Sequence, residues 1–147
     1  MLAASVRVEK MEYLKLIEMT GGFVAKLLGM RKDRKLEVAG LLSEIADTLS
    51  QFPAKVRAGA TYEELAGLAQ QAGGYATKFR DATKDVLNAQ ETLRFQQLLN
   101  QVHDAKDALL QRPPAERDER LRLISEVAGS MRVSAATLRG SASQLKH

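Results

Sequence analysis

Cysteine and tryptophan are both missing from this 147-residue chain, and only 5% of its residues are aromatic. Without cysteine the chain has no disulfides, thiolate metal sites or cysteine nucleophiles, a composition that fits a reducing cytosol. The shortage of aromatic rings leaves few platforms for stacking nucleobases or sugars. Alanine, leucine and methionine must fill much of the core, and we expect a cytoplasmic protein.

Long hydrophobic runs are also missing. A bilayer-spanning helix needs about 20 mainly apolar residues, and the most apolar stretch, residues 13–30, carries Lys15, Glu18 and Lys26. The first ten residues mix charged and apolar side chains, unlike a secretory signal. We therefore expect neither a transmembrane helix nor secretion, although the chain could associate peripherally with a membrane.

Charge is concentrated in one place. The formal net charge is +4, and the run from Arg31 to Lys35 holds four bases and one acid. Elsewhere bases alternate with acids, as on the solvated face of an ordinary helix. This pattern argues against nucleic acid as a partner.

The chain shows no set of residues typical of catalysis. It has no Gly-x-Ser-x-Gly motif and only two histidines, and the pairs Gly21-Gly22 and Gly73-Gly74 lack the spacing of a phosphate-binding loop. His103 and Asp107 would share a helical face, but a metal site needs three or four convergent donors. We expect no enzyme activity, no cofactor and no metal, with His103 exposed to solvent.

The three prolines, Pro53, Pro113 and Pro114, divide the chain, and between them apolar residues recur three and four positions apart, the period of an α-helix. A chain of this length buries one sizeable core. The sequence predicts an all-α, antiparallel up-down bundle of four to five helices in one domain, 1–147. The expected helices span 6–30, 32–51, 61–87, 90–112 and 114–145.

The first expected helix carries two neighbouring apolar stripes, wider than the face of an ordinary surface helix. One stripe is Tyr13, Leu16, Phe23, Leu27 and Met30, and the other is Leu14, Ile17, Gly21, Val24 and Leu28. We expect this helix to lie centrally or to meet a second apolar partner. Gly21-Gly22 lowers its stability and predicts a kink or break, which would permit a movable N-terminal arm.

The remaining boundaries follow from proline and capping residues. Pro53 is expected to end the second helix, and Thr61 with Glu64 forms a capping box that starts the third. Asn88 is expected to cap a fourth helix after a turn at 87–90; the alternative is one helix over 61–112. Gly67 and Gly74 would let a neighbouring backbone approach closely.

The last expected helix has the most regular apolar stripe, from Leu121 to Leu145, and a weaker row of small residues on the opposite face. That row is Gly129, Val133, Ala136, Gly140 and Ser143. One interpretation is a second helix contact, within the bundle or with another copy; the other is a poorly packed C-terminal helix that frays.

Residues 20–35 also have two interpretations. Apolar residues followed by a basic cluster could place a helix at an anionic membrane surface. Alternatively, Phe23, Val24, Leu27 and Leu28 fill the core while 31–35 form a solvated corner whose cations suit a helix C-terminus.

Three stretches, 31–39, 42–49 and 62–69, resemble the small helical N-terminal domains of bacterial, notably cyanobacterial, conflict and cell-death proteins. Such domains are similar to the four-helix bundles of the HeLo and mixed-lineage kinase domain-like group, and the resemblance covers about residues 20–100. It implies a non-enzymatic bundle that self-associates and, in some members, engages membranes. The residues to which the membrane or partner contact would carry over are Phe23, Lys26, Leu27, Arg31, Lys32, Arg34 and Lys35.

Together these observations predict a protein-interaction module related to signalling or defence, acting on a protein partner or on copies of itself. The alternative is a membrane-associating, cell-death-type effector that acts through residues 20–35.

Overall fold

The computed structural model describes residues 2–104 and 113–144. Within these ranges the chain forms helices joined by turns and contains no strand, so the predicted all-α class is confirmed. The helices are α1 (Leu2–Leu27), α2 (Lys32–Arg57), α3 (Tyr62–Thr83), α4 (Ala89–Val102) and α6 (Pro114–Gln144).

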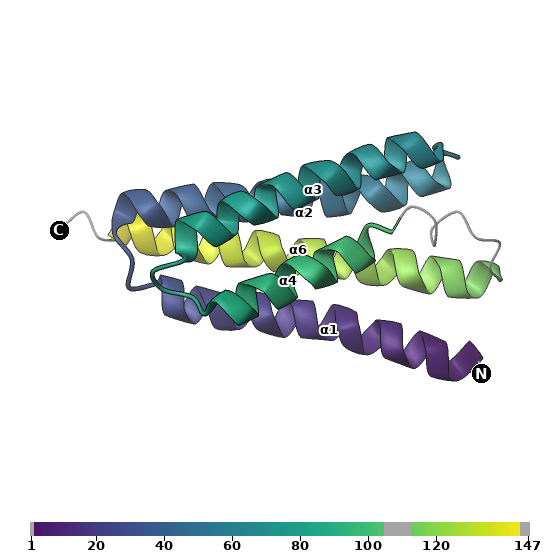
Figure 1. The fold of residues 1–147 in the computed structure, drawn as a ribbon, viewed down its shortest axis with the longest axis horizontal. Coiled ribbons are helices and arrows are strands. Elements are labelled where there is room, and N and C mark those ends of the chain that lie inside the picture. The colour runs from purple at the N-terminus through teal and green to yellow at the C-terminus, as the bar shows by residue number, and fades with distance from the viewer. Residues whose placement is uncertain (1, 105–112, 145–147) are drawn as a thin grey trace.

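The helices run lengthwise beside one another (Figure 1). Helix α6 packs against α2 and α1, α3 packs against α2 and α4, and α4 also meets α1. The packing therefore forms a closed circuit around a shared core, in which the last helix docks along two others. These contacts are compatible with the predicted up-down connectivity.

The predicted apolar stripes form this core. Completely buried positions include the whole α2 stripe and most of the α6 stripe, namely Val38, Leu42, Ile45, Leu49 and Phe52, with Ile124, Ala128, Met131, Ala135, Leu138 and Ala142. Phe23, Phe79 and Phe95 come from three helices and meet one another at ring-centroid distances of 5.3–5.9 Å. Tilted and edge-on aromatic pairs add specific attraction to the area that they bury.

The prediction that Pro53 ends the second helix is wrong. Helix α2 continues through Pro53 to Arg57, because Phe52 and Pro53 are both buried and Val56, one turn further on, packs against the core. The helix ends where Gly59 adopts a φ of 80°. There the Gly59 amide donates to Val56 O and the Ala60 amide donates to Lys55 O at 2.9 Å, the pattern of a Schellman motif.

Helix α1 also differs from the expectation. It runs unbroken through Gly21 and Gly22 and ends at Leu27 rather than Met30. The predicted break is absent because flanking residues such as Thr20 and Phe23 are buried against the bundle, and tertiary packing outweighs the weak helix propensity of glycine.

The turn between the third and fourth helices is confirmed, so the described part of residues 61–112 contains two helices. Helix α3 ends at Thr83, earlier than expected, and Asn88 Oδ1 accepts from the Gln90 amide at 2.7 Å. At the other end of α3, Thr61 Oγ1 accepts from the Glu64 amide, which confirms the threonine cap. Helix α4 ends at Val102, and the predicted continuation over 105–112 lies outside the described residues.

The expectation of close backbone contacts at Gly67 and Gly74 is wrong. A Cβ atom built at either position would meet nothing within 4 Å, so both glycines face open space. Helix α6 begins at Pro114, as predicted, and Leu145 lies outside the described residues.

Candidate interaction surface

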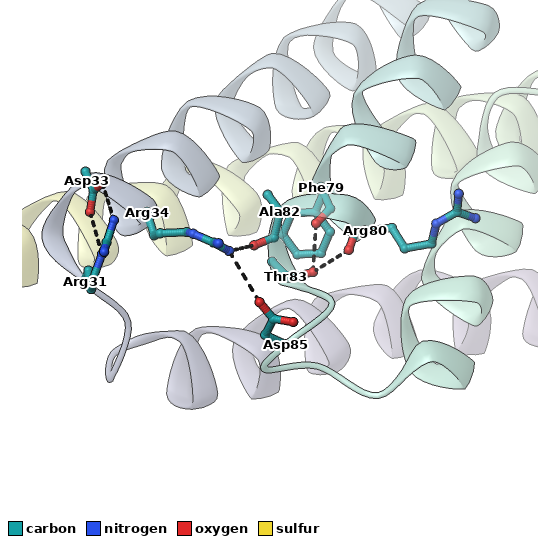
Figure 2. Close-up of polar contacts among 8 residues, drawn as sticks. All are labelled: Arg31, Asp33, Arg34, Phe79, Arg80, Ala82, Thr83 and Asp85. Carbon is teal, nitrogen blue, oxygen red and sulfur yellow. Dashed lines mark hydrogen bonds and ion pairs between the residues drawn. The ribbon is translucent and has the colours of Figure 1, made fainter.

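The basic cluster lies where α1 passes into α2. Arg31 donates to the carboxylate of Asp33 at 2.9 and 3.4 Å, and both side chains are exposed (Figure 2). This hydrogen bond is the main reason that the pKa of Asp33 is lowered. Arg31 is therefore partly neutralised by a neighbour within the same turn.

Arg34 extends away from this turn toward the end of α3. Its Nη1 donates to Ala82 O at 3.1 Å and lies 4.0 Å from a carboxylate oxygen of Asp85 (Figure 2). Because the last carbonyls of a helix have no partner within the helix, a cation placed there is favourable. Arg34 thereby ties the start of α2 to the turn between α3 and α4.

Two open grooves adjoin Arg34. One, of about 320 Å³, is lined by the α1–α2 turn together with Asp85 and Val86. The other, of about 470 Å³, lies between α2 and α3, where Glu37 and Asp81 accompany Arg34, Lys78 and Lys84. The mixture of acids and bases leaves neither groove with the strong single-sign charge that would select an ionic ligand.

Lys35 differs from the other cations of the basic cluster because it is fully buried. Its side chain is 0% exposed, and Nζ donates to Leu28 O at 3.0 Å and to Ser141 Oγ at 2.8 Å. The prediction of a solvated corner is therefore wrong for Lys35, because its long stem carries the amino group inward to acceptors at the ends of α1 and α6. Only the tertiary fold brings these two ends together, since 106 positions separate Lys35 from Ser141.

The predicted contact residues fall into two groups. Phe23, Leu27 and Lys35 are buried in the bundle, which confirms for Phe23 and Leu27 the interpretation that they fill the core. Lys26, Arg31 and Lys32 are exposed and Arg34 is partly buried. Lys26 pairs with Glu91 on α4 at 3.2 Å. In this conformation only Lys26, Arg31, Lys32 and the partly buried Arg34 can meet a partner.

A second surface lies on the outer faces of α1 and α6. Much of the second apolar stripe is uncovered: Leu14 and Gly21 on α1 are exposed, Ile17 is partly buried and Val24 is buried. Leu28, directly after α1, is 40% exposed, so the interpretation that it fills the core is wrong for this residue. On α6 the row of small residues is exposed except for the partly buried Gly129, and Val133 is 66% exposed. Two adjacent helices therefore present apolar or small side chains that the described bundle does not cover.

The expectation that His103 is solvated is wrong. Its side chain is 1% exposed, and its ring lies edge-on to Phe52 at a centroid distance of 5.5 Å. The signal was present in the sequence, because His103 follows Leu99 by four positions on the buried side of α4. Among the described residues no group of three or more histidine, aspartate or glutamate side chains is placed to hold a metal ion; Asp107 lies outside those residues.

No helix within the described ranges is long and apolar enough to cross a bilayer. Comparison of the chain with protein-family models, with curated proteins and with solved structures finds no match.

Proposed function

We propose that this chain is a non-enzymatic interaction module, of the signalling or defence type, that binds a second copy of itself through the outer faces of α1 and α6. The observation that carries this proposal is the uncovered stripe of small and apolar residues on α6, which lies beside α1 with its exposed Leu14 and the exposed Leu28 directly after it. Exposed apolar surface of this kind marks sites of protein association.

The α6 row fits another helix closely. Its members follow one another at spacings of four, three, four and three positions, the repeat that forms a continuous seam between two helices. Gly129 and Gly140 have open space where a Cβ would stand. A neighbouring helix can therefore approach the α6 backbone along this row.

The sparse charge along this seam allows a second copy to occupy it. Each chain has a net charge of +4, so two copies repel each other over most approaches. Between Val127 and Ser143 only Arg132 and Arg139 are charged, and Arg132 is paired with Asp47 of α2 at 3.2 Å. Repulsion is thus weakest along the α6 row, and a two-fold axis would place identical small residues against each other.

The proposal predicts a mass that depends on concentration. Sedimentation velocity from micromolar to millimolar protein should show the average mass rising from one chain toward two. Val133→Glu should weaken association by about a hundredfold, because burying two unpaired carboxylates in a symmetric interface costs several kcal/mol.

Gln70→Glu provides the matched control. Gln70 is exposed on α3, so this substitution adds the same charge away from the seam and should leave the association unchanged. A mass of one chain at every concentration overturns self-association, and equal weakening by both substitutions would show that the contact is not specific to the α6 row.

The resemblance of residues 20–100 to the HeLo and mixed-lineage kinase domain-like group supports the same class of function, since it implies self-association without catalysis. We also propose antiparallel up-down connectivity for this chain. It is supported by the short connections between α1 and α2, α2 and α3, and α3 and α4.

The second candidate is a membrane-associating effector that uses residues 20–35. The exposure of Lys26, Arg31 and Lys32 at one end of the bundle favours it. The burial of Phe23 and Leu27 opposes it, because these side chains would have to leave the core to enter a bilayer.

A further inference from the structure

His103 is a buried ionisable residue at the point where α4 ends. It is the C-terminal cap of α4, and its ring fills a site between Phe52 of α2 and its own helix. The ring is therefore part of the contact that holds the end of α4 against α2.

The hydrogen bonds of the ring fix its protonation. Nδ1 lies 2.9 Å from Leu99 O, and since a carbonyl only accepts, Nδ1 carries the proton and Nε2 the lone pair. Nε2 is buried and has no hydrogen-bond partner among the described residues. The neutral ring fits this site, because Nε2 makes no hydrogen bond to the described residues there and protonation would place a positive charge in a buried position.

Within residues 2–104 and 113–144 no acidic side chain is among the causes of the pKa shift of His103. Burial is the largest influence and lowers the pKa of His103 below its usual 6.5, while the backbone of Leu99 and of Thr48 opposes it more weakly. Neighbouring elements carry Glu12 on α1, Lys55 on α2, Arg120 on α6 and Asp104 next in the chain. None of these charged groups contributes to the shift.

We propose that His103 is an acid-sensitive latch, which holds the C-terminal end of α4 against α2 while its ring is neutral and releases that end when the ring is protonated. The direction of the pH effect follows from the difference in proton affinity between the closed and the opened chain. Below pH 6.5 the unfolded or opened chain binds a proton that the closed bundle resists, so acid favours opening. The stability that the neutral ring gives to the closed state is fully present above pH 6.5 and is lost as the pH falls below that value. The equilibrium constant between the closed and opened states changes by at most tenfold for each pH unit.

The test uses the only other histidine, His147. In the His147→Ala chain, the NMR shift of the remaining imidazole should titrate with a midpoint below 6.5. Hydrogen-exchange protection factors of amides near the end of α4 should fall between pH 7.5 and 5.5, while those in the middle of α3 fall less. This window lies above the range in which ordinary carboxylates titrate.

The double variants His103→Gln/His147→Ala and His103→Phe/His147→Ala keep a neutral side chain at every pH. Either one should show α4 protection that no longer changes between pH 7.5 and 5.5. The proposal is overturned if the His103 midpoint is 6.5 or higher, or if α4 protection in His147→Ala is independent of pH. It is also overturned if a folded double variant retains the same pH dependence. Because the His147→Ala measurements need no substitution in the core, they decide the question even if neither double variant folds.

Discussion

Lys35 illustrates how one side chain can join distant elements. Its Nζ bonds Leu28 O directly after α1 and Ser141 Oγ in the last turns of α6. The C-terminal end of a helix carries partial negative charge, so a cation is favoured between two such ends. The apolar stem is buried at the same time, which adds hydrophobic stabilisation to the two hydrogen bonds.

We expect Lys35→Ala to lower the free energy of unfolding by about 2–4 kcal/mol, because it deletes the buried stem and leaves two acceptors without their donor. Lys35→Met keeps most of the stem and should cost less, which separates packing from hydrogen bonding. Urea denaturation at pH 7 measures both.

Lys32→Ala is the matched control, since Lys32 is exposed three positions earlier in the same basic cluster. Its effect should stay within about 0.5 kcal/mol of zero. Equal effects of Lys32→Ala and Lys35→Ala would contradict the buried position of Lys35.

At the scale of single elements, two glycines illustrate opposite roles. Gly59 ends α2 with a φ of 80°, a left-handed conformation that side chains with a Cβ disfavour. Gly74 lies inside α3, is exposed, and has open space where a Cβ would stand. The first glycine is required by backbone geometry, whereas the second only weakens its helix.

We therefore expect Gly59→Ala to destabilise the protein by about 1 kcal/mol and Gly74→Ala to stabilise it by roughly 0.5–1 kcal/mol. Thermal and urea unfolding of the two variants beside the parent chain measure both effects. A stabilising Gly59→Ala would rule out the Schellman motif at the end of α2.

At the scale of the whole molecule, the closed circuit of helix contacts decides which surfaces are available. The three phenylalanines from α1, α3 and α4 contact one another. Inserting residues 20–35 into a bilayer would withdraw Phe23 from this cluster and leave a cavity beside Phe79 and Phe95, which would cost the packing contacts of that side chain. Self-association through the outer faces requires no such opening.

Sedimentation with anionic liposomes separates these alternatives. If the chain is a membrane-associating effector, the parent chain should sediment with the liposomes at low salt. The triple variant Arg31→Glu/Lys32→Glu/Arg34→Glu should not sediment, because each cation near an anionic surface contributes about 1 kcal/mol of binding free energy. Lys35 is left unchanged since it is buried. If the parent chain does not sediment at any salt concentration, the hypothesis of a membrane-associating effector is wrong.

The sequence alone determined the helical class, the core stripes, the caps at Thr61 and Asn88 and the start of α6 at Pro114. These features depend on residue spacing and on bonds between near neighbours, such as that from the Gln90 amide to Asn88. Helix periodicity and capping hydrogen bonds involve residues only a few positions apart, so they can be predicted from the sequence.

The tertiary structure alone decided the rest. Contacts between segments far apart in the sequence decide which stripe of α1 is covered and whether α2 continues past Pro53. They also decide where the side chains of Lys35 and His103 lie. A lysine is solvated or buried according to which acceptors its stem can reach, and the acceptor at Ser141 is supplied by another helix. Burial energy depends on the completed packing of all the helices, and residue spacing within one helix does not contain that information.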